Sequence, residues 1–93
     1  MAASRVYRFD YLAPNSSASV FIHGYSNTQA VNYSAVVYPG TGVGVPYPLG
    51  HITVTQGETF AHVDGTVGRL VSVQNLAPFN SCTLDILQII ESF

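Results

Sequence analysis

The sequence predicts an all-β fold, a small antiparallel β-sandwich of about six to eight strands with Greek-key or jelly-roll connections. Turn-forming clusters rich in Gly, Pro, Asn and Ser recur about every eight to twelve residues. Short runs rich in Val, Ile, Tyr, Phe and Thr lie between them, and apolar and polar residues alternate in several of these runs. With 93 residues and no repeat or linker, residues 1–93 are expected to form one domain.

Three runs in the first half of the chain alternate with the period of two that is typical of a half-buried strand. In the first run, Arg8 and Asp10 are expected in solvent. The second run, Ser19–Tyr25, places Val20 and Ile22 on one face and Phe21 and His23 on the other. The expected core-facing residues of the other two runs are Tyr7, Phe9 and Tyr11 in Val6–Leu12, and Val31, Tyr33, Ala35 and Val37 in Ala30–Tyr38.

The second half of the chain resembles a meander, and Asp64-Gly65 is its strongest hairpin signal. A type I′ turn needs two residues that tolerate positive φ, and Asp-Gly meets this requirement. A two-residue loop at this point places His62 opposite Val67. It also places Phe60 opposite Arg69, where a cation–π contact is expected.

A second hairpin is expected at Gln56-Gly57, with two registers open. A two-residue loop places His51 opposite His62, close enough for both imidazoles to bind one metal ion. A three-residue loop instead gathers Ile52, Val54 and Phe60 on one face and separates the histidines. The hydrophobic pattern favours the second register.

The C-terminal run Cys82–Phe93 fits either a strand or a helix. As a helix, it has Leu84, Leu87 and Ile90 about three residues apart. As a strand, it places Cys82, Leu84, Ile86 and Ile90 on one face, interrupted only by Gln88. We favour a strand because every other element is β. In that setting Cys82 is expected to be a small buried apolar residue.

The chain contains no lysine, and charged residues make up 9% of it, with three arginines and a formal net charge of −2. Ordinary soluble domains have roughly 25% charged residues. Nucleic acid and an acidic membrane surface are poor partners for such a chain, because both are bound through clustered Lys and Arg. A neutral surface rich in hydroxyl and amide groups suits uncharged partners or further copies of the same chain.

The single cysteine, Cys82, excludes an intrachain disulfide. The N-terminal residues contain no apolar run that would serve as a signal peptide, and no apolar stretch is long enough to span a membrane as a helix. These observations leave the compartment open. They fit the cytoplasm, export by a route without a cleaved N-terminal signal, or a sequence that begins after its signal.

No catalytic residue, metal site or cofactor is predicted. Ser26 follows His23 by three residues, but a turn serine has no enforced geometry toward that imidazole. The "GTGVGV" stretch is followed by prolines instead of the helix that a phosphate-binding loop needs. The acidic residues show no pairing across a cleft. A small hydrolase or metal protein that uses the histidines stays as a further alternative.

The loop "YPGTGVGVPYPLGH" at 38–51 is either a crossover between sheets or a recognition loop. Tyr38 and Tyr47 offer flat rings with a polar hydroxyl, which suit stacking on a sugar or a protein. We expect a non-catalytic module that self-associates or binds a protein partner through weakly charged strand faces and loops rich in Tyr, Asn and Ser. The alternative is a lectin-like domain that binds a neutral carbohydrate through Tyr38, Tyr47, Asn27 and Asn32.

Overall fold

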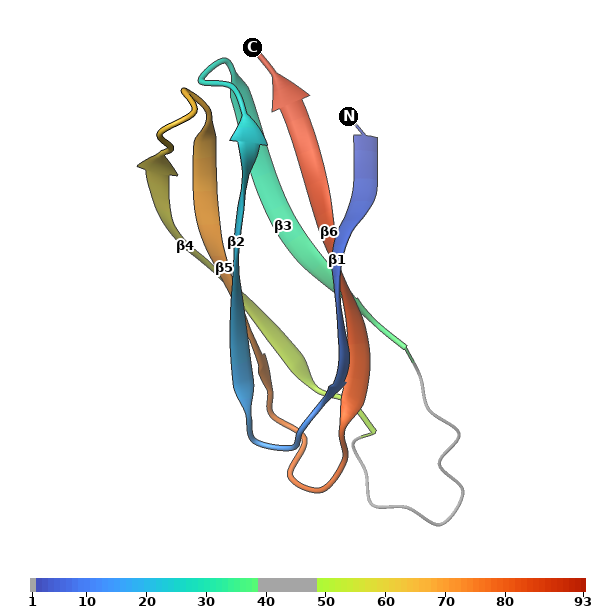
Figure 1. Ribbon diagram of the computed structural model, residues 1–93. Helices are drawn as coiled ribbons and strands as arrows, with labels where there is room; N and C mark the ends of the chain where they lie inside the picture. Colours follow the sequence, from blue (N-terminus) through green and yellow to red (C-terminus); the bar gives the residue numbers. More distant parts are fainter. Residues whose placement is uncertain (1, 39–48) are drawn as a thin grey trace.

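The computed structural model describes residues 2–38 and 49–93, and the described chain is all-β (Figure 1). Six antiparallel strands form two three-stranded sheets, which confirms the predicted fold class. The described residues contain no helix and therefore no helix that could cross a membrane. The strands are β1 (Ala2–Leu12), β2 (Ser17–Tyr25), β3 (Gln29–Val37), β4 (Ile52–Ala61), β5 (Val67–Asn75) and β6 (Cys82–Ser92).

One sheet has the order β1-β6-β3 and the other β2-β5-β4. The two central strands, β5 and β6, are each paired on both sides, and the other four strands are edges. Among the six strands only β4 and β5 are consecutive neighbours in one sheet, so every other connection passes from one sheet to the other. The finer expectation of Greek-key or jelly-roll connections stays a prediction.

The core lies between the two central strands. Val71 and Val73 of β5 and Leu84 and Ile86 of β6 are almost completely buried. Cys82 is buried as expected, and burial raises the pKa of its thiol. The C-terminal run is therefore a strand, and its predicted apolar face is the one that packs inward. The alternation predicted for β2 and β3 is also confirmed, with Val20, Ile22, Val31, Tyr33, Ala35 and Val37 in or against the core.

The core face predicted for the first strand is only partly correct. Phe9 packs against the core, but Tyr7 is 46% exposed and Tyr11 is 78% exposed. Irregularities in the pairing with β6 fall between Arg5 and Tyr7 and between Phe9 and Leu12. A β-bulge inserts an extra residue and changes which face the following side chains occupy. Tyr11 lies in the second irregularity with a φ of 53°, which explains why strict alternation failed there.

The hairpin predicted at Gln56-Gly57 is wrong in both registers. β4 runs continuously through these residues and pairs with β5 along its length, with a bulge between Gln56 and Thr59. Gly57 lies in this bulge, where a Cβ would come within 3.0 Å of the Leu70 carbonyl oxygen. The glycine therefore marks a close backbone approach inside a strand instead of a turn. His51 precedes β4 and does not face His62.

The hairpin predicted at Asp64-Gly65 is present, but its register is one residue away from the expected one. His62 donates its backbone N–H to the Thr66 carbonyl at 2.8 Å, and Gly65 has a φ of 85°. The loop therefore has three residues and ends in a left-handed glycine, the next most common hairpin type. Phe60 consequently faces Gly68, and Arg69 faces Thr59, so the expected Phe60–Arg69 pair is not formed.

Candidate functional site

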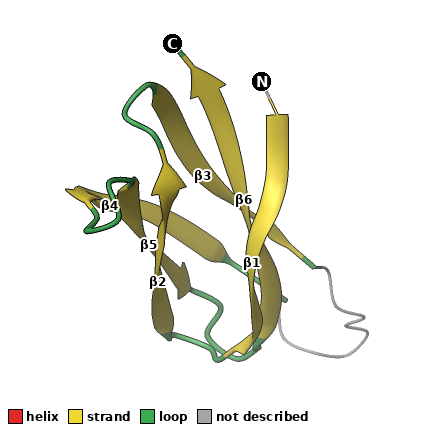
Figure 2. Cartoon of the chain, turned by 45° about the horizontal axis from the view of Figure 1, so that its top comes forward, coloured by secondary structure: helices red, strands yellow, loops and turns green. Residues whose placement is uncertain are grey.

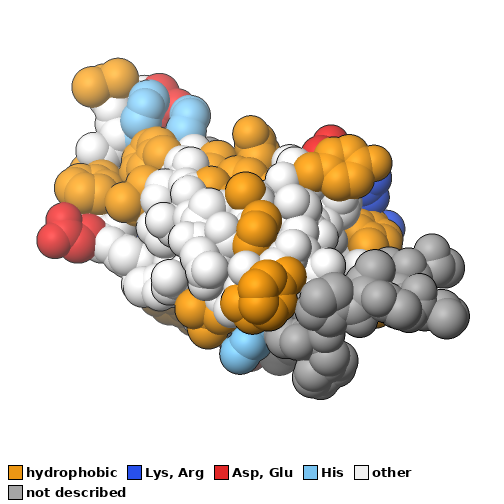
Figure 3. Space-filling model, turned by 90° about the horizontal axis from the view of Figure 1, so that it is seen from below, with side chains coloured by type: hydrophobic (Ala, Val, Ile, Leu, Met, Phe, Trp, Pro, Cys, Tyr) orange, Lys and Arg blue, Asp and Glu red, His pale blue; other side chains and the backbone are white. Residues whose placement is uncertain are grey.

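Aromatic side chains gather at one end of the outward face of the β2-β5-β4 sheet. Phe21 and His23 come from β2, and Phe60 and His62 come from β4 and the hairpin that follows it. The Phe21 ring centroid lies 5.7 Å from that of His23, 6.0 Å from Phe60 and 6.1 Å from His62. We call these four residues the aromatic patch. In Figure 3, hydrophobic side chains likewise lie beside histidines and an acidic group at one corner of the molecule.

Gly68 of β5 allows this patch to form. It is paired with His23 on one side and with Phe60 on the other. A Cβ at this position would lie 2.4 Å from Phe21 Cζ and 2.7 Å from His23 Cβ. Because the central strand has no side chain here, rings from the two edge strands meet across it.

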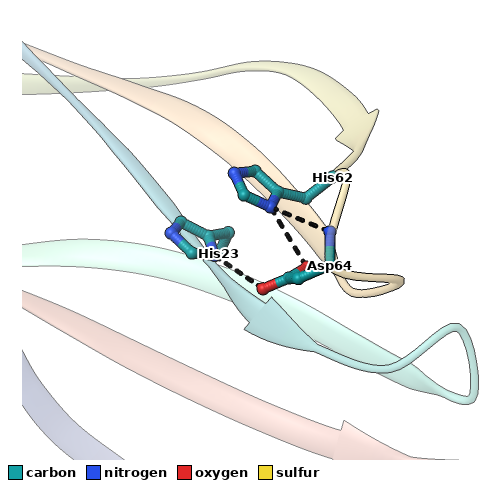
Figure 4. A group of neighbouring side chains, drawn as sticks. All are labelled: His23, His62 and Asp64. Atoms are coloured by element: carbon teal, nitrogen blue, oxygen red, sulfur yellow. Dashed lines mark hydrogen bonds and ion pairs between the residues drawn. The ribbon is translucent and has the colours of Figure 1, made fainter.

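The two histidines are in direct contact. Their ring centroids are 4.2 Å apart, and the ring planes differ by 5°. The Asp64 carboxylate lies beside them, and both Nδ1 atoms face it (Figure 4). His62 Nδ1 is 3.1 Å from Asp64 Oδ1, and His23 Nδ1 is 3.8 Å from Asp64 Oδ2. The three side chains form a small polar group at the border of the aromatic patch.

Thr66 fixes the Asp64 carboxylate in this position. The Thr66 backbone N–H and hydroxyl both donate to Asp64 Oδ1, at 2.9 and 2.5 Å. These two hydrogen bonds, with a smaller contribution from His62, lower the pKa of Asp64 to about 2. The carboxylate is therefore ionised at neutral pH. Its Oδ2 atom has no hydrogen-bond donor among the described residues.

The two sheets are joined along the side where β3 lies against β4. Gln56 Oε1 accepts the backbone N–H of Tyr33 at 3.1 Å and an N–H of Arg69 at 2.9 Å. Arg69 also donates to the Val31 carbonyl at 3.4 Å. The side chains of the β2-β5-β4 sheet thus occupy backbone groups on the free edge of β3. We call this the closed side.

The opposite side of the sandwich, between β1 and β2, lacks such hydrogen bonds between its two edge strands in the described chain. In both ribbon views β1 and β2 are edge strands of different sheets that follow each other through a turn (Figures 1 and 2). In the described part of the chain no hydrogen bond joins β1 to β2. Apart from Tyr25, which is buried at the end of β2, the residues of these strands that pack against the core are only partly buried: Val6, Phe9, Leu12, Ala18, Val20 and Ile22. We call this the open side.

The edge strands differ in how they are protected against pairing with another chain. β1 contains Arg5, Arg8 and Asp10 and two pairing irregularities, and β4 contains Glu58 and a bulge. The free edge of β3 is covered by side chains, as described above. β2, with the sequence SASVFIHGY, contains no charge and no proline, and its single irregularity lies at its end, at Gly24. Charges, bulges and coverage are the usual edge protections, and β2 has the least of them.

A second polar cluster surrounds the buried Asp85 on the outward face of β6. Arg5 Nε and Arg8 Nε each lie 2.8 Å from an Asp85 carboxylate oxygen, and the Tyr38 hydroxyl donates to the same carboxylate. The Arg8 guanidinium also stacks over the Tyr38 ring, 4.8 Å from its centroid. The hydrogen bonds from Arg8 and Tyr38 lower the pKa of Asp85 to about 2 and, in return, raise that of Arg8.

Of the four residues predicted to bind a ligand, the structure brings together two. Asn27 and Asn32 line one open hollow of about 330 Å³, together with the Arg69 side chain. Tyr38 is engaged with Asp85 and Arg8, and Tyr47 lies outside the described residues. The assignment of these residues as one ligand site stays a prediction.

Sequence reasoning missed the His23–His62–Asp64 group. Alternation does place His23 on the outward face of its strand, and the Asp-Gly hairpin does place Asp64 beside His62. The missing information was that β2 and β4 flank the same central strand, with a glycine between the histidines. The predicted two-residue loop also pairs His62 with Val67, whereas in the structure His62 is bonded to Thr66. This shift by one residue separates the His62 ring from that of His23 in the predicted arrangement.

The chain matches no family model, no curated protein and no solved structure. Its function is therefore argued from its own geometry alone.

Proposed function

We propose that the chain is a non-catalytic assembly module that associates with further copies of itself through the free edge of β2. The observation that carries the proposal is that this nine-residue edge strand is uncharged and unpaired on its outer side in the described chain. A row of free backbone N–H and C=O groups on such an edge is a template for another strand.

The partial burial of the open side supports the same proposal. Val20 and Ile22 are half-buried on the inward face of β2, and Phe21 is 37% exposed on its outward face. A second strand placed beside β2 would cover apolar surface on both faces of the sheet. Removal of apolar surface from water stabilises an association by about 25 cal/mol per Å² before the entropic costs of association.

The weak charge of the chain also favours a second copy as the partner. β2 contains no charge that would repel its own copy. The chain also contains no lysine, the residue that most often protects an edge strand from pairing with another chain. Pairing of β2 with β2 of a second copy in antiparallel orientation would generate a two-fold axis and one continuous six-stranded sheet. This arrangement is closed and needs no further contacts.

A pair of double variants tests the proposal with matched controls. Ser17 and Ser19 of β2 are exposed and face Gln74 and Ser72 of β5, and Thr53 and Thr55 of β4 face the same two residues from the other side. Ser17→Lys/Ser19→Lys therefore adds two positive charges to the β2 edge strand. Thr53→Lys/Thr55→Lys adds the same two charges to the opposite edge strand of the same sheet.

Self-association is measured by light scattering after size exclusion, over a range of protein concentrations. We expect the wild-type chain to associate, the β2 variant to raise its dissociation constant at least about tenfold, and the β4 variant to leave it near the wild-type value. Circular dichroism establishes that both variants remain folded. A wild-type chain that stays monomeric at the highest concentration, or equal weakening by both variants, would contradict the proposal.

A second candidate, binding of a neutral carbohydrate, is favoured by the hollow that Asn27 and Asn32 share. Side-chain amides are suitable partners for sugar hydroxyls because each can donate and accept hydrogen bonds. The test is a glycan array probed with the wild-type chain and with Asn27→Ala/Asn32→Ala. We expect any glycan bound by the wild type to be lost in the variant. Binding that survives the double substitution would remove the hollow as the site.

A further inference from the structure

We propose that His23, His62 and Asp64 together bind one divalent transition-metal ion, with Zn²⁺ as the representative case. One ligand atom of each side chain lies within 4.8 Å of those of the other two. The three residues come from β2 and from the β4–β5 hairpin and meet at one end of the sheet (Figure 4). The inference concerns these three side chains only and does not depend on the proposed self-association.

The ligand types fit such an ion. Imidazole nitrogen suits Zn²⁺, Cu²⁺ and Ni²⁺, and a carboxylate oxygen completes many zinc sites. Two His and one carboxylate make a three-ligand set that leaves the fourth tetrahedral position for water or another group. Mg²⁺ and Ca²⁺ prefer sets made of oxygen, so they are expected to bind weakly at this position.

The positions of the ligand atoms also fit, and the two rings, which are stacked with planes 5° apart, need to turn before both lone pairs point at one ion. Both His Nδ1 atoms face the Asp64 carboxylate, where two nitrogen lone pairs and an anionic oxygen would repel one another without a proton or a cation between them. The Asp64 backbone N–H donates to His62 Nδ1 over a long 3.4 Å, so this nitrogen carries a lone pair, and an ion would replace that weak hydrogen bond. Asp64 Oδ1 is occupied by Thr66, so Oδ2, which has no donor among the described residues, is the oxygen available to an ion.

The separations require only a modest contraction. Tetrahedral zinc with bonds of about 2.0 Å holds its ligand atoms roughly 3.3 Å apart. His23 is exposed and His62 is half-buried, so rotation of the two imidazoles about their side-chain bonds is the movement that would bring the ligand atoms closer. Gly68 leaves room for the rings across β5, and the hydrogen bonds from Thr66 orient the Asp64 carboxylate.

Isothermal titration of the purified chain with ZnCl₂ tests the inference, with His51→Ala as the matched control. His51 is the third histidine, is exposed, and precedes β4 at the other end of the strand from His62. The variants are His23→Ala, His62→Ala and Asp64→Asn, each checked for folding by circular dichroism. Titrations with MgCl₂ and CaCl₂ test the selectivity.

We expect one Zn²⁺ per chain in the wild type and in His51→Ala. Each of the other three variants is expected to bind at least about tenfold more weakly, since loss of even an outer-sphere partner of a metal ligand costs tenfold or more. Absence of zinc binding by the wild type overturns the inference. So does an equal loss in His51→Ala, or Mg²⁺ binding as tight as that of Zn²⁺. The titration gives the number of Zn²⁺ ions per chain, so its interpretation is the same whether or not the chain self-associates.

Discussion

On the closed side of the sandwich, Gln56 and Arg69 occupy backbone groups of the facing β3 edge, whereas on the open side no hydrogen bond joins β1 to β2 in the described chain. The packing differs in the same sense. Val31 and Tyr33 of β3 are buried, but the core-facing residues of β1 and β2 are only half-buried, except Tyr25 at the end of β2.

The difference arises largely from one local feature of β4. The bulge between Gln56 and Thr59 interrupts the pairing with β5 where the Gln56 side chain reaches the Tyr33 N–H. A bulge commonly re-aims a side chain in this way. β2 has no irregularity in its middle, and among the described residues no polar side chain of the other sheet forms a hydrogen bond with its edge. We therefore expect the open side, and not the closed side, to bind a partner.

The largest expected effect compares the same substitution at the centre of the core and on the open side. Ile86→Ala, at a fully buried residue, should lower the free energy of unfolding by about 2–5 kcal/mol. Ile22→Ala, at a half-buried residue, should lower it by about 1 kcal/mol, because less apolar surface is lost from the core. Urea unfolding at low protein concentration gives both values. Equal losses would mean that the open side is as well packed as the centre.

A smaller effect is expected from the closed side. Gln56→Ala removes the acceptor of the Tyr33 N–H and of Arg69, and an unsatisfied buried group costs about 1–3 kcal/mol. Gln74→Ala, at an exposed residue on the outward face of β5, should change stability by less than about 0.5 kcal/mol. The two glutamine variants are compared by urea unfolding. If both variants change the free energy of unfolding equally, the hydrogen bonds of Gln56 do not stabilise the closed side.

The smallest effect concerns Asp85, whose arginine partners are 66% and 51% exposed at the side chain, so that solvent screens the charges. Its pKa is about 2 in the folded chain and near 3.8 ordinarily. The folded-state pKa is the lower one, so this contribution to stability is present above about pH 4 and is lost as the pH falls toward 2.

Urea midpoints of the wild type and of Asp85→Asn, measured from pH 7 to pH 2, check this expectation. The wild type should be the more stable at pH 7, and the difference should shrink between about pH 4 and pH 2. Asp64 also has a lowered pKa, and the comparison of the two chains removes its contribution. A difference that stays constant down to pH 2 would show that the Asp85 charge has no role.

The sequence predicted those features that depend on local alternation. The inward faces of β2, β3 and β6 follow from a period of two, and the Asp64-Gly65 hairpin follows from turn chemistry. The bulges in β1 and β4 were missed, because an extra residue in a strand has no strong local signal and Gly57 resembles a turn. The burial of Asp85 was missed because its partners, Arg5, Arg8 and Tyr38, lie 47 or more residues away in the chain. The contact between His23 and His62 likewise depends on which strands share a central neighbour.

Amide hydrogen exchange at several protein concentrations tests the central claim most directly. The claim is that the free edge of β2 pairs with a second copy while the β3 edge is satisfied within the chain. The account predicts that the β2 amides not bonded to β5 exchange more slowly as the concentration rises, while the Tyr33 amide, bonded to Gln56, does not change. Association without any slowing in β2, or β2 amides that exchange at the same rate at every concentration, would contradict it.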